Sequence, residues 1–154
     1  MFNPREWHDI TSQTKEDPIT TLSTVSLCGA ATVFVVKDVL GSVEHYRDML
    51  GFRTEFTYDQ PTFYAGVERN GVVIHLQAAD HTKRQPGQGA VNVFVTDVDA
   101  LYQELKSRGA RVLNEPKDYP YGMRDFDIND LDGNQLCFGM ESKRQLTGSE
   151  QPTS

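Results

Sequence analysis

Two strand-like segments each carry a side chain that can ligate a metal or take part in nucleophilic catalysis. His75 follows Val73-Ile74, and Cys137 lies between Leu136 and Phe138. Catalytic zinc sites use three protein ligands and structural sites use four, so His75 and Cys137 alone are too few ligands for either kind of zinc site. A histidine can also activate a cysteine, but the sequence identifies no third group to orient that histidine. We therefore predict no catalytic residue and no metal ligand. The plainer alternatives are a hydrogen-bonded His75 and a Cys137 that acts as a small buried apolar residue.

Side-chain alternation places both residues on the more polar faces of their strands. Successive strand residues point to opposite faces, and on four strands one face is uniformly apolar while the other is mixed. We expect the apolar faces to pack on helices and the mixed faces to line a cleft. A small-molecule pocket combines apolar walls with a few polar groups. The predicted ligand-binding residues on these faces are His75, Gln77, Asn92, Phe94, Gln135 and Cys137, with Tyr64 from a further strand.

The segment from Tyr119 to Asp125 is rich in aromatic residues and carries charge. It reads Tyr119-Pro120-Tyr121-Gly122-Met123-Arg124-Asp125. A flat or cationic ligand can stack on Tyr119 or Tyr121, with Asp125 or Asp127 nearby for its charge. Tyr121 and Arg124 therefore complete the set of predicted ligand-binding residues. In the alternative reading, the tyrosines cover a sheet edge and Arg124 pairs with a neighbouring acid.

An internal repeat positions these side chains. The segment Val33-Phe34-Val35-Val36-Lys37-Asp38-Val39 is echoed by Asn92-Val93-Phe94-Val95-Thr96-Asp97-Val98. A helical apolar pattern follows each copy, with Asp38 and Asp97 as candidate N-caps. Gly51 and Gly109 stand where each helix is expected to end.

Three strand-like segments follow each predicted helix. They span residues 53–58, 62–68 and 72–77 in the first copy, and 110–114, 124–128 and 134–140 in the second. Asn70-Gly71 predicts a type I′ hairpin, and Asp132-Gly133 marks the corresponding turn. The pattern predicts an α+β fold of two βαβββ modules, at about 30–79 and 89–140 within a domain of 28–140. Residues 80–88 form the linker, 1–27 an arm or short helix, and 141–154 a flexible tail.

Composition limits the classes of partner. The 154 residues suffice for one domain with a core. The net charge of −7 argues against nucleic acid as a partner and is compatible with cationic ligands or simply with solubility. Two cysteines cannot form a disulfide framework, and neither a secretory signal nor an apolar run long enough to cross a membrane is visible. We expect a cytoplasmic protein with no membrane partner.

The repeated pattern resembles the glyoxalase/bleomycin-resistance group of the vicinal oxygen chelate superfamily. The resemblance covers roughly residues 30–140, including Asp38-Val39, Leu50-Gly51-Phe52 and Asp130-Leu131-Asp132-Gly133-Asn134. It implies a cleft enclosed by paired modules, and a homodimer, because members of this group often complete their clefts across two chains.

Metal-dependent members place a His, Glu or Gln ligand on the first and last strand of each module. The matching positions here are Ala31, His75, Ala90 and Cys137. Alanine has no donor atom, so the resemblance implies that the usual metal site is missing, and we expect no cofactor.

Three hypotheses follow. The leading one is a metal-free small-molecule binding protein of the bleomycin-resistance type, linked to antibiotic resistance, which sequesters a bulky aromatic or cationic ligand. The second is a glyoxalase-like lyase or dioxygenase, whose divalent metal is held by His75 and groups outside the usual positions. The third is an accessory domain whose own side chains fill its cleft.

Overall fold

A computed structural model describes residues 24–143, which form two βαβββ modules in sequence. The first module consists of β1 (Thr32–Val36), α2 (Val39–Leu50), β2 (Arg53–Tyr58), β3 (Tyr64–Arg69) and β4 (Val72–Ala78). The second consists of β5 (Ala90–Phe94), α3 (Val98–Arg108), the short strands β6 (Arg111–Val112) and β7 (Lys117–Asp118), β8 (Met123–Asn129) and β9 (Gln135–Glu141). A 3-10 turn, η2 (Ala79–His81), opens the linker between them. This architecture confirms the predicted fold class.

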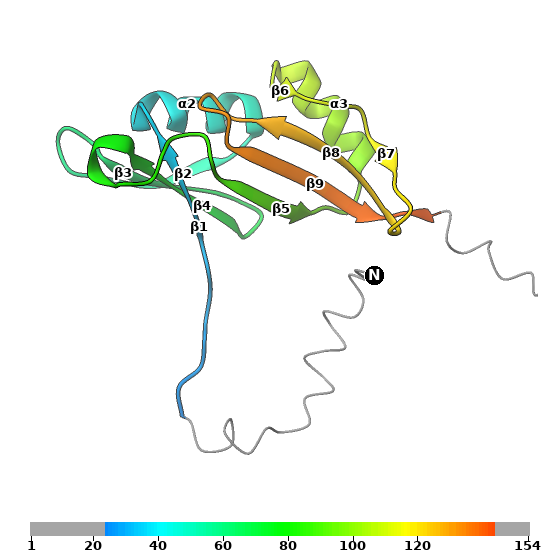
Figure 1. The fold of residues 1–154 in the computed structure, drawn as a ribbon, viewed down its shortest axis with the longest axis horizontal. Coiled ribbons are helices and arrows are strands. Elements are labelled where there is room, and N and C mark those ends of the chain that lie inside the picture. The colour runs from blue at the N-terminus through cyan, green and yellow to red at the C-terminus, as the bar shows by residue number, and fades with distance from the viewer. Residues whose placement is uncertain (1–23, 144–154) are drawn as a thin grey trace, which may run out of the picture.

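Each module has the same sheet topology. The strand orders are β1-β4-β3-β2 and β5-β9-β8-β6, and in each sheet the first strand runs parallel to the last while the other pairs are antiparallel. Both helices lie on the same side of the paired sheets (Figure 1). Within residues 24–143, no helix covers the opposite faces of the two sheets, which are called the uncovered faces below.

The helix boundaries follow from the capping residues that the sequence predicts. The Asp38 carboxylate accepts from the Gly41 N–H at 3.1 Å, and Asp97 accepts from the Ala100 N–H at 3.0 Å. These bonds satisfy N–H groups that lack partners within the first turn of a helix. Gly51 and Gly109 end the helices with φ values of 71° and 89°, in the left-handed region that glycine adopts without a steric penalty.

Strand alternation places the core between the helices and the apolar sheet faces, as predicted. The helix-facing side chains are buried and belong to both modules: Phe34, Val36, Ile74, Leu76, Val93, Phe126, Ile128, Leu136 and Phe138. Val35, on the opposite face of β1, is buried as well. The Val35 carbonyl accepts from the Gly87 N–H and from the Asn134 side chain, so the linker and the β8–β9 turn lie next to this residue. Because Val35 is buried, its side chain does not line an open cleft.

Two predicted strand boundaries were wrong. The third strand begins at Tyr64 instead of residue 62, because residues 59–63 form the turn after β2. The predicted strand 110–114 is shortened to β6, and a further short strand, β7, follows outside the predicted range. Between them the Asn114 side chain accepts from the Asp127 N–H at 3.0 Å, which replaces a backbone ladder bond, and Pro116 has no N–H to donate. The predicted arm and tail fall largely outside the described residues.

A buried polar cluster joins the two modules at the β8–β9 turn. The Asp130 carboxylate accepts from the backbone N–H groups of residues 132, 133 and 134, from the Asn134 side chain and from the Tyr46 hydroxyl on α2. Asn134 in turn donates to the Val35 carbonyl at 3.1 Å and accepts from the Gly89 N–H at 2.9 Å. Asp130 and Asn134 are almost fully buried, so these bonds must satisfy groups that water cannot reach.

We expect Asn134→Ala to lower the free energy of unfolding by about 2–4 kcal/mol, because it leaves the Gly89 N–H without its side-chain partner and removes one hydrogen bond each from the Val35 carbonyl and the buried Asp130 carboxylate. Urea denaturation measures this loss. Asn92→Ala is the matched control, since Asn92 is exposed, and its expected change is within about 0.5 kcal/mol. Equal losses in the two variants would show that the cluster does not hold the modules together.

A second prediction concerns His45, which is buried on α2 and whose Nε2 atom has no hydrogen-bond partner among residues 24–143. Burial lowers the pKa of His45, although Asp130 partly opposes the shift. The unfolded chain therefore binds this proton more tightly than the folded chain does. Stability should be fully present above the unfolded pKa of about 6.5 and should decline as the pH falls below it.

Urea midpoints at pH 8, 6.5 and 5 test this dependence by comparing the wild type with His45→Gln, which cannot take up the proton. The other histidines are common to both proteins, so their contributions cancel. We expect the variant to lose less stability between pH 8 and pH 5. If both proteins lost the same stability between pH 8 and pH 5, His45 would not contribute to the pH dependence of stability.

Candidate functional site

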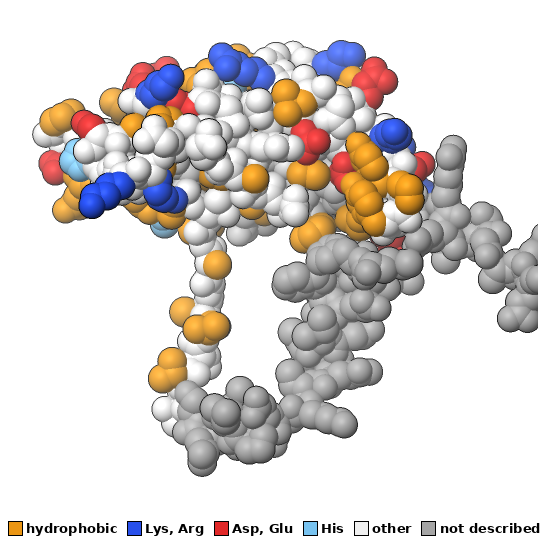
Figure 2. Space-filling model, viewed as in Figure 1, with side chains coloured by type: hydrophobic (Ala, Val, Ile, Leu, Met, Phe, Trp, Pro, Cys, Tyr) orange, Lys and Arg blue, Asp and Glu red, His pale blue; other side chains and the backbone are white. Residues whose placement is uncertain are grey.

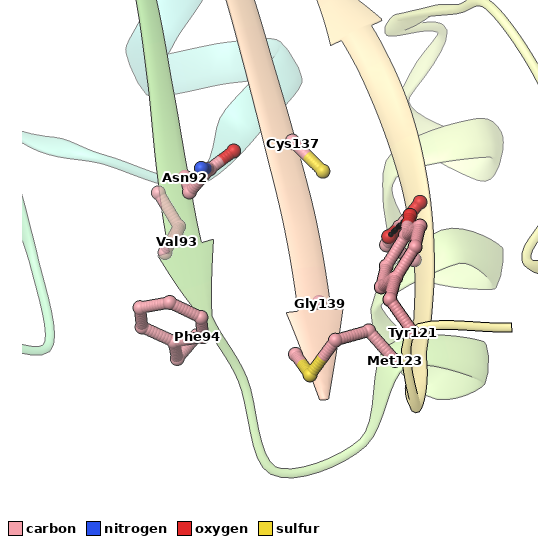
Figure 3. Close-up of a pocket in the computed structure, with 8 residues that line it drawn as sticks. Asn92, Val93, Phe94, Tyr121, Met123, Cys137 and Gly139 are labelled. Carbon is pink, nitrogen blue, oxygen red and sulfur yellow. Dashed lines mark hydrogen bonds between the residues drawn. The ribbon is translucent and has the colours of Figure 1, made fainter. Parts of the chain in front are cut away.

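The uncovered face of the second sheet carries a pocket of about 270 Å³. It lies over β5, β9 and β8, and the loop before β8 closes one side (Figure 3). The lining residues are Asn92, Val93, Phe94, Tyr121, Met123, Asp125, Cys137 and Gly139. The sequence predicted four of these as ligand-binding residues, namely Asn92, Phe94, Tyr121 and Cys137.

Sheet register explains how residues that are distant in the sequence meet in this pocket. Phe94 on β5 pairs with Gly139 on β9, and Gly139 pairs with Asp125 on β8. Gly139 has no side chain, and the Asp125 Cβ and the Met123 methyl group lie 3.4 and 3.5 Å from the place that a Cβ would take, so these two side chains border the pocket over Gly139. One row further along, Asn92, Cys137 and the β8 residue Asp127 are paired in the same way. The pocket thus has an aromatic wall on β5 and one lining carboxylate, Asp125, on β8.

The two aromatic walls are accessible to a ligand. Phe94 is 49% exposed and Tyr121 is 47% exposed. Tyr121 stacks on Tyr119 with ring centroids 5.1 Å apart and planes inclined by 8°. Its hydroxyl donates to the Asp125 carboxylate at 2.8 Å, which fixes the ring beside the pocket. Exposed rings held in fixed positions are suited to stacking against a flat ligand.

Asp125 is the main electrostatic feature of the pocket. Asp125 is only 8% exposed, and its carboxylate accepts a hydrogen bond from the Tyr121 hydroxyl. Burial raises the pKa of Asp125, the nearby Asp127 carboxylate raises it further, and the Tyr121 hydrogen bond opposes both effects. A bound cation would relieve this unfavourable ionisation, because an opposite charge within a few ångströms favours the carboxylate form.

The Cys137 thiol is a poor nucleophile in this setting. Burial raises the pKa of Cys137 to about 12, and the charges of Asp125 and Asp127 act in the same direction. A reactive cysteine instead needs an environment that stabilises its thiolate. Cys137 therefore serves as a wall of the pocket.

The first sheet carries a separate aromatic group on its own uncovered face. Phe56 lies over Gly66, stacks on Tyr64 at 6.2 Å and meets the His75 ring edge-on at 5.3 Å. The Tyr64 hydroxyl lies 3.0 Å from His75 Nδ1. His75 and Tyr64 thus come together as the alternation predicts, but they line the face of the first module and not the pocket of the second.

The remaining predicted residues lie elsewhere. Gln77 is held by Arg84, which donates to its side-chain carbonyl at 3.0 Å. Gln135 is half-buried on β9 beyond the pocket lining. Arg124 is directed toward the helix side of β8, where it forms a bidentate pair with Asp99 on α3. The alternative reading of Arg124, as a partner of a neighbouring acid, describes its contacts.

Val93, Met123 and Gly139 were not among the predicted site residues, and Asp125 was named only as one of two carboxylates, with Asp127, that could supply charge beside a stacked ligand. The period-2 pattern of β8 could have found Met123, since Phe126 and Ile128 mark the core face and the odd-numbered residues between Met123 and Asp127 must face the other way. The role of Gly139 depends on pairing across three strands, which a single-sequence pattern does not contain.

The four positions that match the metal ligands of the resembling family do not form a ligand set. Ala31 and Ala90 have no donor atoms, and His75 and Cys137 lie on different sheets. Within residues 24–143, no group of three or more His, Cys, Asp or Glu side chains is arranged to hold a metal ion. These residues therefore do not fit the family's metal.

Comparison with known proteins agrees with the fold. The model of the Glyoxalase/Bleomycin resistance protein/Dioxygenase superfamily matches residues 30–138. A member of that superfamily from Sphaerobacter thermophilus DSM 20745 is 25% identical with a TM-score of 0.66, and the match covers 75% of this chain and 98% of that chain. No match was found among curated proteins.

Two further crystal structures are similar. A bleomycin-binding protein from bleomycin-producing Streptomyces verticillus, in complex with copper(II)-bleomycin, is 28% identical with a TM-score of 0.62, covering 75% of this chain and 97% of that chain. A protein from Nocardioides shares the fold at 20% identity and a TM-score of 0.64, covering 97% of this chain and 98% of that chain. Because the family model matches residues from both modules, this chain belongs to the Glyoxalase/Bleomycin resistance protein/Dioxygenase superfamily.

Proposed function

We propose that this protein binds and sequesters a bulky aromatic cation, without a metal, in the pocket beside Asp125. The observation that carries the proposal is a nearly buried carboxylate between two exposed aromatic walls, Phe94 and Tyr121. The rings supply stacking area and cation–π attraction, and the carboxylate supplies a charge-assisted contact. The alanines at two of the four family ligand positions favour binding without a metal.

A homodimer is part of this proposal. The pocket of about 270 Å³ is slightly smaller than the usual small-molecule site of about 300–1,000 Å³, and it is open on the side away from the helices. The aromatic group of Phe56, Tyr64 and His75 faces the same open side from the first sheet. A second copy that places its first sheet over the second sheet of its partner would enclose the pocket between the two surfaces. We expect sedimentation to show this dimer.

Sequestration of a toxic aromatic cation is a form of antibiotic resistance, and we place it in the cytoplasm. Both cysteines are free, as expected in a reducing compartment. Within the described residues, no helix is long and apolar enough to cross a membrane.

Titration calorimetry with bleomycin and with ethidium tests the binding proposal. We expect both cations to bind, and Asp125→Asn to weaken each by about tenfold or more, equivalent to about 1.4 kcal/mol, because the neutral amide loses the charge attraction. Asp59→Asn changes the net charge equally in the turn after β2, outside the pocket, and should leave affinity within about twofold. Absence of binding, or equal effects of both substitutions, would contradict the proposal.

Thiol reactivity tests whether Cys137 is only a wall of the pocket. With a pKa of about 12, its thiolate fraction at pH 7.5 is on the order of a thousandfold below that of an ordinary cysteine. In Cys28→Ser, we expect iodoacetamide to modify Cys137 at least tenfold more slowly in the folded protein than in urea. Fast modification of the folded protein would instead indicate an activated nucleophile.

A further inference from the structure

The two oxygens of the Asp125 carboxylate have different surroundings. The Tyr121 hydroxyl donates to Oδ2 at 2.8 Å, and within residues 24–143 no hydrogen bond reaches Oδ1. In the same residues, His45 Nε2 is the one fully buried side-chain nitrogen or oxygen without a partner. Oδ1 is therefore not sealed inside the protein. Because Asp125 lines the pocket, a ligand can reach this oxygen.

Tyr121 remains a donor to Oδ2 whenever Asp125 is ionised. Burial raises the pKa of Tyr121, and its hydrogen bond to Asp125 raises that pKa further. The hydroxyl therefore keeps its proton over the pH range in which the carboxylate is charged. A cation could take Oδ2 only by displacing this hydroxyl, which would cost a hydrogen bond to a charged group.

A tight turn before β8 holds the Tyr121 ring in place. The Gly122 N–H donates to the Tyr119 carbonyl at 3.0 Å, and the Tyr119 N–H donates to the Met123 carbonyl at 2.8 Å. The Ser142 N–H, just after β9, donates to the Gly122 carbonyl at 2.8 Å. Gly122 has a φ of 89°, in the left-handed region that glycine adopts without strain. These bonds, together with the stacking on Tyr119, keep the hydroxyl at Oδ2.

The basic neighbour of Asp125 makes its contact elsewhere. Lys117 on β7 pairs with Asp125 on β8, and its ammonium lies over the Tyr119 ring, 5.5 Å from the ring centroid. Among residues 24–143, no Lys, Arg or His forms an ion pair with Asp125. Asp127, on the same face of β8, adds negative charge. Exposed hydrophobic side chains lie beside charged ones around β7 (Figure 2), so apolar surface and acid occur together near the pocket.

A single free carboxylate oxygen favours one class of cation. An ammonium with N–H groups is a compact charge that can donate to one oxygen. A guanidinium binds a carboxylate best through two parallel hydrogen bonds, which need both oxygens. A quaternary ammonium has no N–H to donate, and proteins bind such ions in aromatic cages. Of the residues that line this pocket, only Phe94 and Tyr121 are aromatic, which is too few for a cage.

We infer that the pocket selects an aromatic ligand whose cation is a primary or secondary ammonium, in preference to a guanidinium or a quaternary ammonium. The Tyr121 hydroxyl is the specificity-determining group against guanidinium, because it occupies one oxygen of Asp125 and leaves the other for a single N–H donor. The inference rests on the proposed function and names the chemical class of its ligand. Ethidium carries a quaternary charge, so it still stacks and is attracted, but its charged nitrogen lacks the N–H that Oδ1 would accept.

Three naphthalene probes with one positive charge each test this selection. They are 2-naphthylmethylammonium, 2-naphthylmethylguanidinium and 2-naphthylmethyl-trimethylammonium, which share the ring and differ in their N–H groups. Titration calorimetry at pH 7.5 measures their affinities for the full chain. We expect the wild type to bind the ammonium about tenfold more tightly than either of the other probes, because only the ammonium satisfies Oδ1 without displacing Tyr121.

Tyr121→Phe tests the role of the hydroxyl. The variant keeps the ring and frees Oδ2, so the affinity of the guanidinium relative to the ammonium should rise by about tenfold. The ammonium should remain about tenfold tighter than the quaternary probe, since that preference depends on N–H groups alone. All three probes need the same carboxylate, so a change in the ionisation of Asp125 cancels in these ratios.

Tyr119→Phe is the matched control, because it removes the hydroxyl of the other ring in the same stacked pair. We expect the ratios of the three affinities to stay within about twofold of the wild type, since the Tyr119 hydroxyl does not occupy Asp125 Oδ2.

Four results would overturn the inference. Equal affinities of the wild type for the three probes, or failure of the ammonium to bind while ethidium binds, would reject the selection and leave the proposed function standing. A guanidinium-to-ammonium ratio that Tyr121→Phe leaves unchanged, or that Tyr119→Phe changes equally, would show that the Tyr121 hydroxyl does not set the preference. Failure of all three probes and of ethidium to bind would reject the proposed function as well.

Discussion

The position of the two modules depends on one buried carboxylate. Asp130 accepts five hydrogen bonds, three of them from the backbone of its own turn, one from the Asn134 side chain and one from Tyr46 in the first module. A charge taken out of water is tolerated only when its lone pairs are satisfied this completely. The bonds shape the β8–β9 turn so that Asn134 reaches the Val35 carbonyl of the first module. The cluster therefore holds the sheets with both uncovered faces on one side.

The first module contains a simpler version of the same arrangement. The Glu68 carboxylate accepts from the Gly71 N–H in the β3–β4 turn and pairs with Arg53, and both contacts hold the pKa of Glu68 below its usual range. At the position that corresponds to Asn134, the first module has Val72, which has no polar atom to bridge the modules. One end of the junction is consequently closed by polar bonds, while the other is an apolar groove. The repeat is thus symmetric in fold and asymmetric in its contacts.

The sequence predicted the parts of this structure that depend on local patterns. The repeated strand–helix unit, the two aspartate caps and the Asn70-Gly71 hairpin were all confirmed, the hairpin by positive φ values at both residues. Each of these features is set by residues within a few positions of one another. The burial of Leu136 and Phe138 also follows from period-2 alternation.

Features that depend on distant residues were not predicted. Asn134 bonds to a carbonyl 99 positions away and Tyr46 to a carboxylate 84 positions away, and no local periodicity contains such pairs. The pocket at Asp125 depends likewise on strand register and on the absence of a side chain at Gly139. Arg124 was assigned to ligand binding because of its charge, yet its place on the core face of β8 directs it to Asp99. Charge and residue type did not reveal which face it occupied.

The proposed binding surface for an aromatic cation is the uncovered face of the second sheet. An amide NMR titration of the labelled protein with bleomycin would locate the ligand, since each backbone N–H reports on its own surroundings. We expect the largest shifts in β5, β8 and β9 around Phe94, Asp125 and Gly139, with little change in α2. Shifts confined to the helix side, or no shifts at saturating ligand, would contradict it.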